Sequence, residues 1–97
     1  MKASEFIELY HTETVKELSD LLGFIIMESD FFPKKLRSLL CEKQKVIVYI
    51  DRRMTTAEKD YCLLIQMGRW LIEKEILDEG ETPEKFVCEW IEKKLEI

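Results

Sequence analysis

The chain has 97 residues, of which 46% are hydrophobic and 10% aromatic. A chain of this size and composition can bury one core and is too apolar to stay disordered, so we expect residues 1–97 to form a single domain. No apolar run reaches the ~18 residues that a bilayer-spanning helix needs, and residues 1–6 do not begin a signal peptide, so no membrane contact is expected. The three cysteines lie in apolar segments, which is typical of reduced thiols in a cytoplasmic protein.

The net charge of −5 arises entirely in the last quarter of the chain. Residues 1–72 hold eleven acidic and eleven basic residues, whereas residues 73–97 hold nine acidic and four basic ones. Within the first part, residues 34–53 carry seven bases against two acids. An uneven charge is most often no more than a solvated surface. The acidic isoelectric point opposes attraction to a phosphate backbone, so we expect no direct nucleic-acid binding, even by the basic segment.

Two short helices are predicted at the start of the chain. Ser4 precedes an amphipathic pattern that includes Phe6 and Ile7, so it is the expected cap of the first helix. Residues 14–17 read Thr-Val-Lys-Glu, the pattern of a capping box, and apolar residues then recur at helical spacing. Gly23 stands where the second helix should end in a left-handed residue.

The middle of the chain contains three candidate strands. Residues 24–27 form a short apolar run and residues 46–50 are rich in β-branched side chains, so both are expected to be strands. Residues 29–33 end in proline, which disfavours helix in the residue before it, and so predict a loop. Residues 36–41 have propensities that permit either a strand or a helix, and their local pattern leaves both open.

A long apolar helix is predicted after the strands. Thr55 and Glu58 form a second capping box that opens it. In residues 61–72 only Gln66 and Arg69 are strongly polar. Such a helix must be covered on nearly every side, so we expect it to form the middle of the core.

A turn at residues 78–80 is expected to end this helix and to lead into the last one. Thr82 is the predicted cap of the last helix, with Pro83 at its first position and Glu84 in its first turn. Apolar residues from Phe86 onward then recur at helical spacing and predict the buried face of this helix.

Few residues have the setting of a catalytic or metal site. His11, the only histidine, lies beside a predicted helix end, where a surface side chain is the ordinary role. Cys62 has no basic neighbour that would generate a thiolate, so it is expected to be a core thiol. The sequence has no phosphate-binding glycine loop, serine elbow or Cys-x-x-Cys pair. We therefore predict no enzyme activity and no cofactor.

Residues 61–71, which follow a predicted strand and a turn, resemble the active-site helix of the ImmA/IrrE family of metallopeptidases. In that family the helix carries His-Glu-x-x-His, whose two histidines bind zinc and whose glutamate activates water. Counted from Gly68, the three positions are Ile65, Gln66 and Arg69 in this chain. An alkyl group, a neutral amide and a guanidinium neither bind zinc nor accept a proton, so the resemblance implies a peptidase fold that no longer cuts.

The resemblance covers about residues 15–91 and implies an α+β, zincin-like minimal domain. Such a domain has an N-terminal helix or helices, a small antiparallel sheet with a hairpin, a central buried helix and a C-terminal helix. The hairpin would join residues 36–41 to residues 46–50, although Ser38 stands where a glycine is usual. The third, acidic zinc ligand of the family corresponds to Thr82, so a bound zinc ion is not expected.

Two interpretations of the polar residues in the central helix are open. In the first, Ile65, Gln66, Arg69 and Thr82 lie in the vestige of the metal cleft, where they bind a partner or, as we expect, fill the gap with packed side chains. Arg69 would then be partly buried and bonded to a carboxylate or to backbone carbonyls. In the second, Gln66 and Arg69 lie on the solvated edge of the helix, and Arg69 reaches water or pairs with Glu73.

The resemblance implies a function in binding and not in catalysis. Family members in phages and mobile elements often act as anti-repressors, so the expected partner is a protein such as a repressor, bound directly by a monomer or a homodimer. The alternative is an inhibitor of a host defence nuclease, in which the acidic C-terminal part imitates nucleic-acid phosphates. The side chains considered for a partner surface are all charged: Arg52, Arg53, Glu73, Asp78, Glu79, Glu81 and Glu84.

Overall fold

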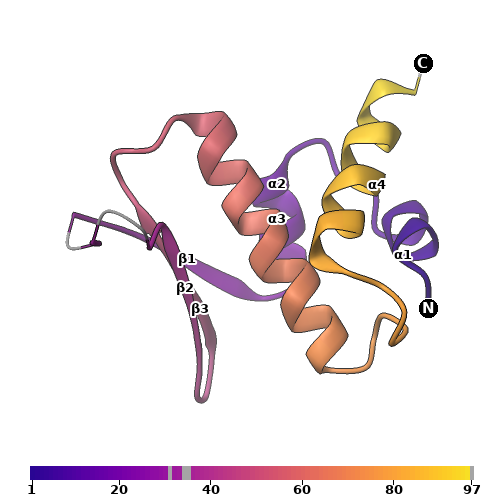
Figure 1. The fold of residues 1–97 in the computed structure, drawn as a ribbon, viewed down its shortest axis with the longest axis horizontal. Coiled ribbons are helices and arrows are strands. Elements are labelled where there is room, and N and C mark those ends of the chain that lie inside the picture. The colour runs from indigo at the N-terminus through magenta and orange to yellow at the C-terminus, as the bar shows by residue number, and fades with distance from the viewer. Residues whose placement is uncertain (31, 34–35, 97) are drawn as a thin grey trace.

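The structure is a computed structural model, and it describes residues 1–30, 32–33 and 36–96. Within these residues the fold is α+β, as predicted, and four helices lie on one side of a three-stranded sheet (Figure 1). The elements in chain order are α1 (Ala3–Leu9), α2 (Val15–Leu21), β1 (Phe24–Ser29), β2 (Ser38–Glu42), β3 (Val46–Asp51), α3 (Thr56–Glu73) and α4 (Pro83–Leu95).

The sheet has the strand order β1-β3-β2 and is mixed. β2 and β3 form the expected antiparallel hairpin, in which Leu40 lies opposite Val48. β1 pairs with β3 in parallel, with Phe24 opposite Val46, so the expectation of a wholly antiparallel sheet is wrong for β1. The reason is the central place of β3, the strand richest in β-branched side chains. β1 and β3 run in the same direction and are neighbours, and β1 and β2 form the two edges of the described sheet.

Three threonines begin the later helices, as predicted. Each hydroxyl accepts a hydrogen bond from the backbone N–H three residues on, at 3.1, 3.2 and 3.1 Å for Thr14, Thr55 and Thr82. At Thr55 the capping box is complete, because the Glu58 carboxylate accepts the Thr55 N–H at 3.0 Å. Gly23 has the expected left-handed backbone, with φ 79°, immediately after α2.

Two predicted helix boundaries are wrong. α1 begins at Ala3, so Ser4 lies inside the helix and is not its cap. Two carboxylates satisfy the first backbone groups instead: Glu5 accepts the Lys2 N–H at 3.1 Å, and the distant Glu81 accepts the Ala3 N–H at 2.5 Å. α3 ends at Glu73, before the predicted turn at residues 78–80, since Glu75 already takes a left-handed φ of 61°.

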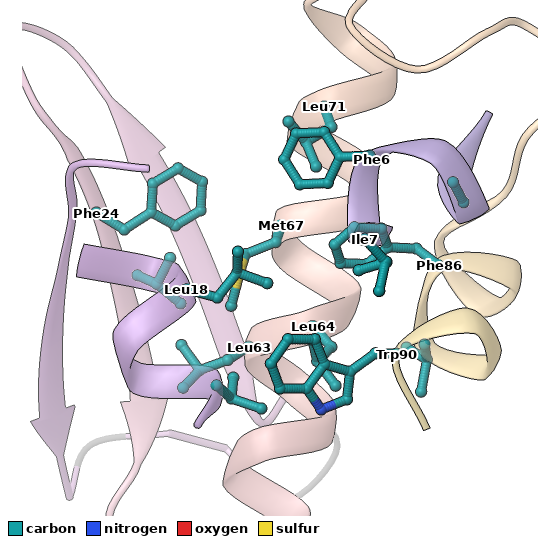
Figure 2. Close-up of a cluster of buried hydrophobic side chains, with 14 of the residues drawn as sticks. Phe6, Ile7, Leu18, Phe24, Leu63, Leu64, Met67, Leu71, Phe86 and Trp90 are labelled. Carbon is teal, nitrogen blue, oxygen red and sulfur yellow. The ribbon is translucent and has the colours of Figure 1, made fainter. Parts of the chain in front are cut away.

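α3 runs through the middle of the core, as its apolar sequence predicts. Figure 2 shows Met67 of α3 facing Leu18 and Phe24 on one side and Phe86 on the other. Phe6 of α1 packs against Phe86, with ring centroids 5.9 Å apart, so α1 joins the same core. No helix of the described residues is both long and apolar enough to cross a membrane.

α3 and α4 approach each other most closely at Gly68. A Cβ atom at this position would lie 3.0 Å from the Cα of Pro83 and 3.1 Å from the Cβ of Phe86. Both distances are shorter than ordinary van der Waals contacts, so a side chain at position 68 would push the two helices apart. Gly68 therefore allows the start of α4 to pack on the middle of α3.

Candidate functional site

A hollow of about 240 Å³ lies between the edge strand β2 and helix α3. Two of the four residues predicted to lie in a cleft, Gln66 and Arg69, line it. Its lining residues belong to both elements and to the segment just before β2: Leu36, Ser38, Leu39, Leu40, Gln66, Arg69, Trp70 and Glu73. We call this hollow, together with the adjacent edge of β2, the cleft.

Gln66 joins the two walls of the cleft. Its side chain is buried, and its Nε2 donates a hydrogen bond of 2.9 Å to the Ser38 hydroxyl on β2. This bond gives the buried Gln66 amide nitrogen the hydrogen-bond partner that a buried polar group requires. Gln66 does not lie on a solvated helix edge, so that alternative is wrong for this residue.

Arg69 does not fill the cleft, contrary to the expectation. Its side chain is exposed, and it makes no hydrogen bond or ion pair with any residue that the structure describes, so the predicted buried bond is wrong. Glu73, also exposed, is not its partner. Arg69 stands three residues after Gln66, a rotation of about 60° around the helix, which carries it from the floor of the cleft to its rim.

The other two predicted cleft residues do not line the hollow. Ile65 is partly buried and packs against the hydrophobic core. The Thr82 hydroxyl is engaged as the cap of α4, where it accepts the Lys85 N–H. Of the four predicted residues the structure therefore brings only Gln66 and Arg69 together.

An ion pair connects the last residue of β2 with the C-cap residue of α3. Lys74 Nζ lies 2.9 Å from a carboxylate oxygen of Glu42. The hydrogen bond from Lys74 lowers the pKa of the Glu42 carboxyl, and the neighbouring Trp70 indole lowers it further. The Trp70 Nε1 is nevertheless buried and makes no hydrogen bond of normal geometry within the described residues.

The outer edge of β2 carries free backbone groups. The Asp51 N–H donates to the Arg37 carbonyl at 3.0 Å, which marks these two residues as a hydrogen-bonded pair of the antiparallel ladder. Since such pairs alternate along an antiparallel ladder, the backbone groups of Ser38, Leu40 and Glu42 point away from β3. β2 is the last strand on this side of the described sheet, so these groups face the cleft side without a strand partner.

The two arginines considered for a partner surface are already engaged within the fold. Arg53 binds the Asp51 carboxylate through two nitrogens, at 2.9 and 2.8 Å, and also donates to the Phe32 carbonyl at 3.0 Å. The hydrogen bonds from Arg53 lower the pKa of Asp51 to about 2. Arg52 lies 3.4 Å from Asp30, in an exposed pair. Both arginines hold the chain at the end of the sheet.

The acidic residues considered for the same surface fall into two groups. Glu73, Asp78, Glu79 and Glu84 are exposed. Glu81 is buried, so its expected place on an exposed surface is wrong. Its carboxylate accepts hydrogen bonds from the Ala3 N–H at 2.5 Å and from Lys85 Nζ at 2.8 Å, which is why burial of the charge is tolerated. The bond from the Ala3 backbone is the main cause of its lowered pKa, followed by the bond from Lys85.

The chemistry-bearing side chains of the described residues do not gather into a metal centre. No three or more histidine, cysteine, aspartate or glutamate side chains among them lie in a group that holds a metal ion. His11 is exposed. Burial raises the pKa of the Cys62 thiol, whose sulfur lies 3.9 Å from the Met54 sulfur, so this cysteine has the environment of a packed thiol and not of a nucleophile.

One surface of the molecule was not predicted from the sequence. Successive side chains of a strand point to opposite faces, and the strand register places one apolar set on the face away from the helices. We call it the outer face; its residues are Ile25, Met27, Leu39, Cys41, Ile47 and Tyr49. The signal was present in the sequence, because all three strands are apolar at successive positions, whereas a half-solvated sheet alternates apolar and polar residues.

A comparison of the chain with protein-family models, curated proteins and solved structures finds no match. The resemblance to the ImmA/IrrE metallopeptidases therefore stays a prediction. The two surfaces that stand out physically are the cleft, with its free strand edge, and the apolar outer face of the sheet.

Proposed function

We propose that this chain is a non-catalytic protein-binding domain that regulates a partner by direct contact and holds an extended segment of that partner along β2. One observation carries the proposal: an edge of the described sheet lies beside a hollow whose rim bears Arg69, and the Arg69 guanidinium pairs with no described residue. An exposed edge with free N–H and C=O groups is a template for an added strand, and the pockets beside it select side chains.

The chemistry of the cleft defines the segment that it fits. The backbone groups of Ser38, Leu40 and Glu42 supply hydrogen bonds to an added strand, whatever its sequence. Arg69 supplies selectivity, since a guanidinium binds a carboxylate with two parallel hydrogen bonds. The occupant is therefore an extended segment with an acidic side chain opposite Arg69.

The residues at the former catalytic positions support binding without catalysis. Ile65 belongs to the core, the Gln66 amide is bonded to Ser38, and Arg69 carries a fixed positive charge. None of the three is a general base or a zinc ligand. The resemblance to phage and mobile-element anti-repressors adds a partner class to the proposal, namely a repressor or a similar regulator.

The test uses the whole chain as bait in the cell that hosts it. We expect a partner captured by the wild-type chain to be lost with Arg69→Glu and kept with Lys16→Glu, a matched charge reversal on the exposed side of α2. Hydrogen exchange on the purified complex should show new protection of the Leu40 and Glu42 amides, which face the free edge.

Two results would contradict the proposal. One is equal capture by the wild-type chain and the folded Arg69→Glu variant. The other is a complex in which the outward amides of β2 exchange as fast as in the free protein, because an added strand must protect them.

A nuclease inhibitor is the second candidate, and one observation favours it. Four acidic side chains line a hollow of about 470 Å³ at the connection between α3 and α4: Glu73, Glu75, Asp78 and Glu79. A row of carboxylates can occupy a basic groove made for phosphates. The observation is weaker than that for the cleft, because Asp78 is paired with the Met1 amine and Glu81 is buried.

A further inference from the structure

The outer face exposes apolar side chains that the rest of the described fold leaves uncovered. Ile25, Met27 and Leu39 are 36, 48 and 42% exposed, and none of the outer-face residues belongs to the hydrophobic core. The opposite faces of the same strands, which carry Phe24, Val48 and Ile50 for example, are buried under the helices. In Figure 1 all labelled helices lie on one side of the sheet, and the outer face is turned away from them.

The sequence of the strands is that of a sheet covered on both faces. β1 begins Phe-Ile-Ile-Met and β3 begins Val-Ile-Val-Tyr-Ile, without the polar residue at every second position that a solvated face requires. Large apolar patches on one side of a domain mark interaction surfaces. Among the described residues, no helix covers this side of the sheet.

Two lysines at the border of the outer face indicate which charge a partner bound there would carry. Lys43 and Lys45, in the β2–β3 turn, line a hollow of about 570 Å³ together with Cys41 and Ile47 of the outer face. Neither lysine forms an ion pair with a described residue, whereas Glu42 between the strand and the turn is bound to Lys74 on the other side. An apolar surface that ends in two uncompensated lysines is complementary to an apolar surface bordered by carboxylates.

This charge pattern argues against a second copy of the chain. In a face-to-face pair, the lysines of one copy would meet either the lysines of the other copy or the opposite end of its sheet. At that end Arg52 is already paired with Asp30 and Arg53 with Asp51. Neither arrangement supplies free carboxylates to Lys43 and Lys45.

The size of the outer face fits one helix. Three strands spaced about 4.8 Å apart offer a width of roughly 10 Å between the outermost strand axes, and five or six residues of strand offer a length of about 17–20 Å. A helix about 10–12 Å in diameter and some three turns long covers this area. We propose that the outer face binds an amphipathic helix of another protein, whose apolar side is flanked by acidic residues.

The probe for this proposal is a synthetic amphipathic helix of about 18 residues, with leucines on one face and glutamates beside them. A matched peptide carries lysines in place of the glutamates. We expect the acidic peptide to bind the full chain at least about tenfold more tightly than the basic one. Binding should perturb the amide resonances of Ile25, Met27 and Ile47, which do not line the cleft.

Variants locate the binding on the outer face and separate it from the cleft. Met27 lies on β1, away from the cleft, and Met27→Glu should weaken the binding of the acidic peptide by at least about tenfold. Leu95→Glu, at another exposed apolar residue, is the matched control and should leave binding unchanged. The double variant Lys43→Glu/Lys45→Glu should reverse the preference between the peptides, and Arg69→Glu should not affect it.

Several outcomes would overturn the proposal. They are the absence of binding by either peptide to the folded chain, equal binding of both peptides, and binding that Met27→Glu leaves intact. A concentration-dependent dimer that Met27→Glu dissociates would assign the face to a second copy instead. Binding to phosphatidylserine-containing phosphatidylcholine vesicles, with no peptide bound, would assign it to a lipid surface.

Discussion

The side-chain amide of Gln66 on α3 donates a hydrogen bond of 2.9 Å to the hydroxyl of Ser38 on β2. This bond connects the central helix to the edge strand across the cleft, and both residues line the hollow. The position at which the resemblance expects a catalytic glutamate is thus used to hold the two walls of the cleft together.

A double-mutant cycle on this pair tests its contribution to stability. Gln66→Ala should lower the free energy of unfolding by about 1–3 kcal/mol, because it removes a buried group and leaves the Ser38 hydroxyl without its donor. The coupling energy with Ser38→Ala should be about 0.5–1.5 kcal/mol, measured by urea unfolding. Gln44→Ala, in the exposed turn, is the control. A coupling energy of zero would show that the bond contributes nothing.

Gly68→Ala should destabilise the protein although alanine is the better helix former. The added methyl group would lie 3.0 Å from the Cα of Pro83, and backbone cannot yield as a side chain does. We expect a net loss of about 1–3 kcal/mol in the free energy of unfolding, against a propensity gain of about 1 kcal/mol. Gly80→Ala, with no atom within 4 Å of the new methyl group, should change stability far less. Equal effects of the two substitutions would contradict the close approach of α3 and α4.

Glu75→Gly should stabilise the protein. Glu75 has a φ of 61°, a left-handed conformation that strains a residue with a Cβ and does not strain glycine. The expected gain is about 0.5–1 kcal/mol in the free energy of unfolding, partly offset by the greater freedom of glycine in the unfolded chain. Glu79→Gly, an exposed acid of the same connection without a positive φ, should give no gain. A loss at position 75 would mean that the left-handed turn is not formed.

Asp51 should make the stability of the protein depend on pH in the acid range. Its folded-state pKa is lowered from 3.8 to about 2 by Arg53, so the stabilisation is present above pH 4 and is lost as the pH falls toward 2. The Asp51→Asn variant lacks this contribution. Its free energy of unfolding should therefore approach that of the wild type as the pH falls. Urea midpoints measured down this pH range provide the test, with the exposed Asp20→Asn as the control. A difference from the wild type that stays constant with pH would contradict the lowered pKa.

Charge reversal of exposed acidic residues between α3 and the first turn of α4 separates the two functional candidates. Glu81 is left unchanged, because lysine there would break its buried bonds to Ala3 and Lys85. The double variant Glu79→Lys/Glu84→Lys should alter partner affinity by less than about threefold if the cleft is the site, since exposed charges contribute little. A nucleic-acid mimic would instead lose binding, show a steep dependence on salt and compete with DNA or RNA for its partner.

The boundaries of most elements were predictable because they depend on neighbours in sequence. Thr14, Thr55 and Thr82 cap helices through hydrogen bonds to residues three positions away, and Gly23 supplies the left-handed stop. The mostly apolar sequence of residues 61–72, in which only Gln66 and Arg69 are strongly polar, likewise predicted a helix covered on nearly every side. The hairpin of β2 with β3 was not decided by local pattern and was expected only from the family resemblance.

The site was predictable only in part, because exposure is a property of the packed molecule. The pattern of residues 61–72 marked Gln66 and Arg69 together as polar positions in an apolar helix. It did not tell that Gln66 would meet Ser38, twenty-eight residues earlier, while Arg69 would remain on the rim. The sequence also did not indicate that Thr82 would cap α4 without lining the hollow.

By itself, the sequence determined the α+β composition, the caps of the three later helices and the apolar central helix, since periodicity and capping act over a few residues. Only the tertiary structure decided that β1 runs parallel to β3 and that Glu81 is buried against Ala3. It also decided that Ile25, Met27 and Leu39 are exposed on the sheet face opposite the helices. These features depend on which distant segments meet, and the free energy of such contacts is set by the packing of the whole chain and not by local pattern.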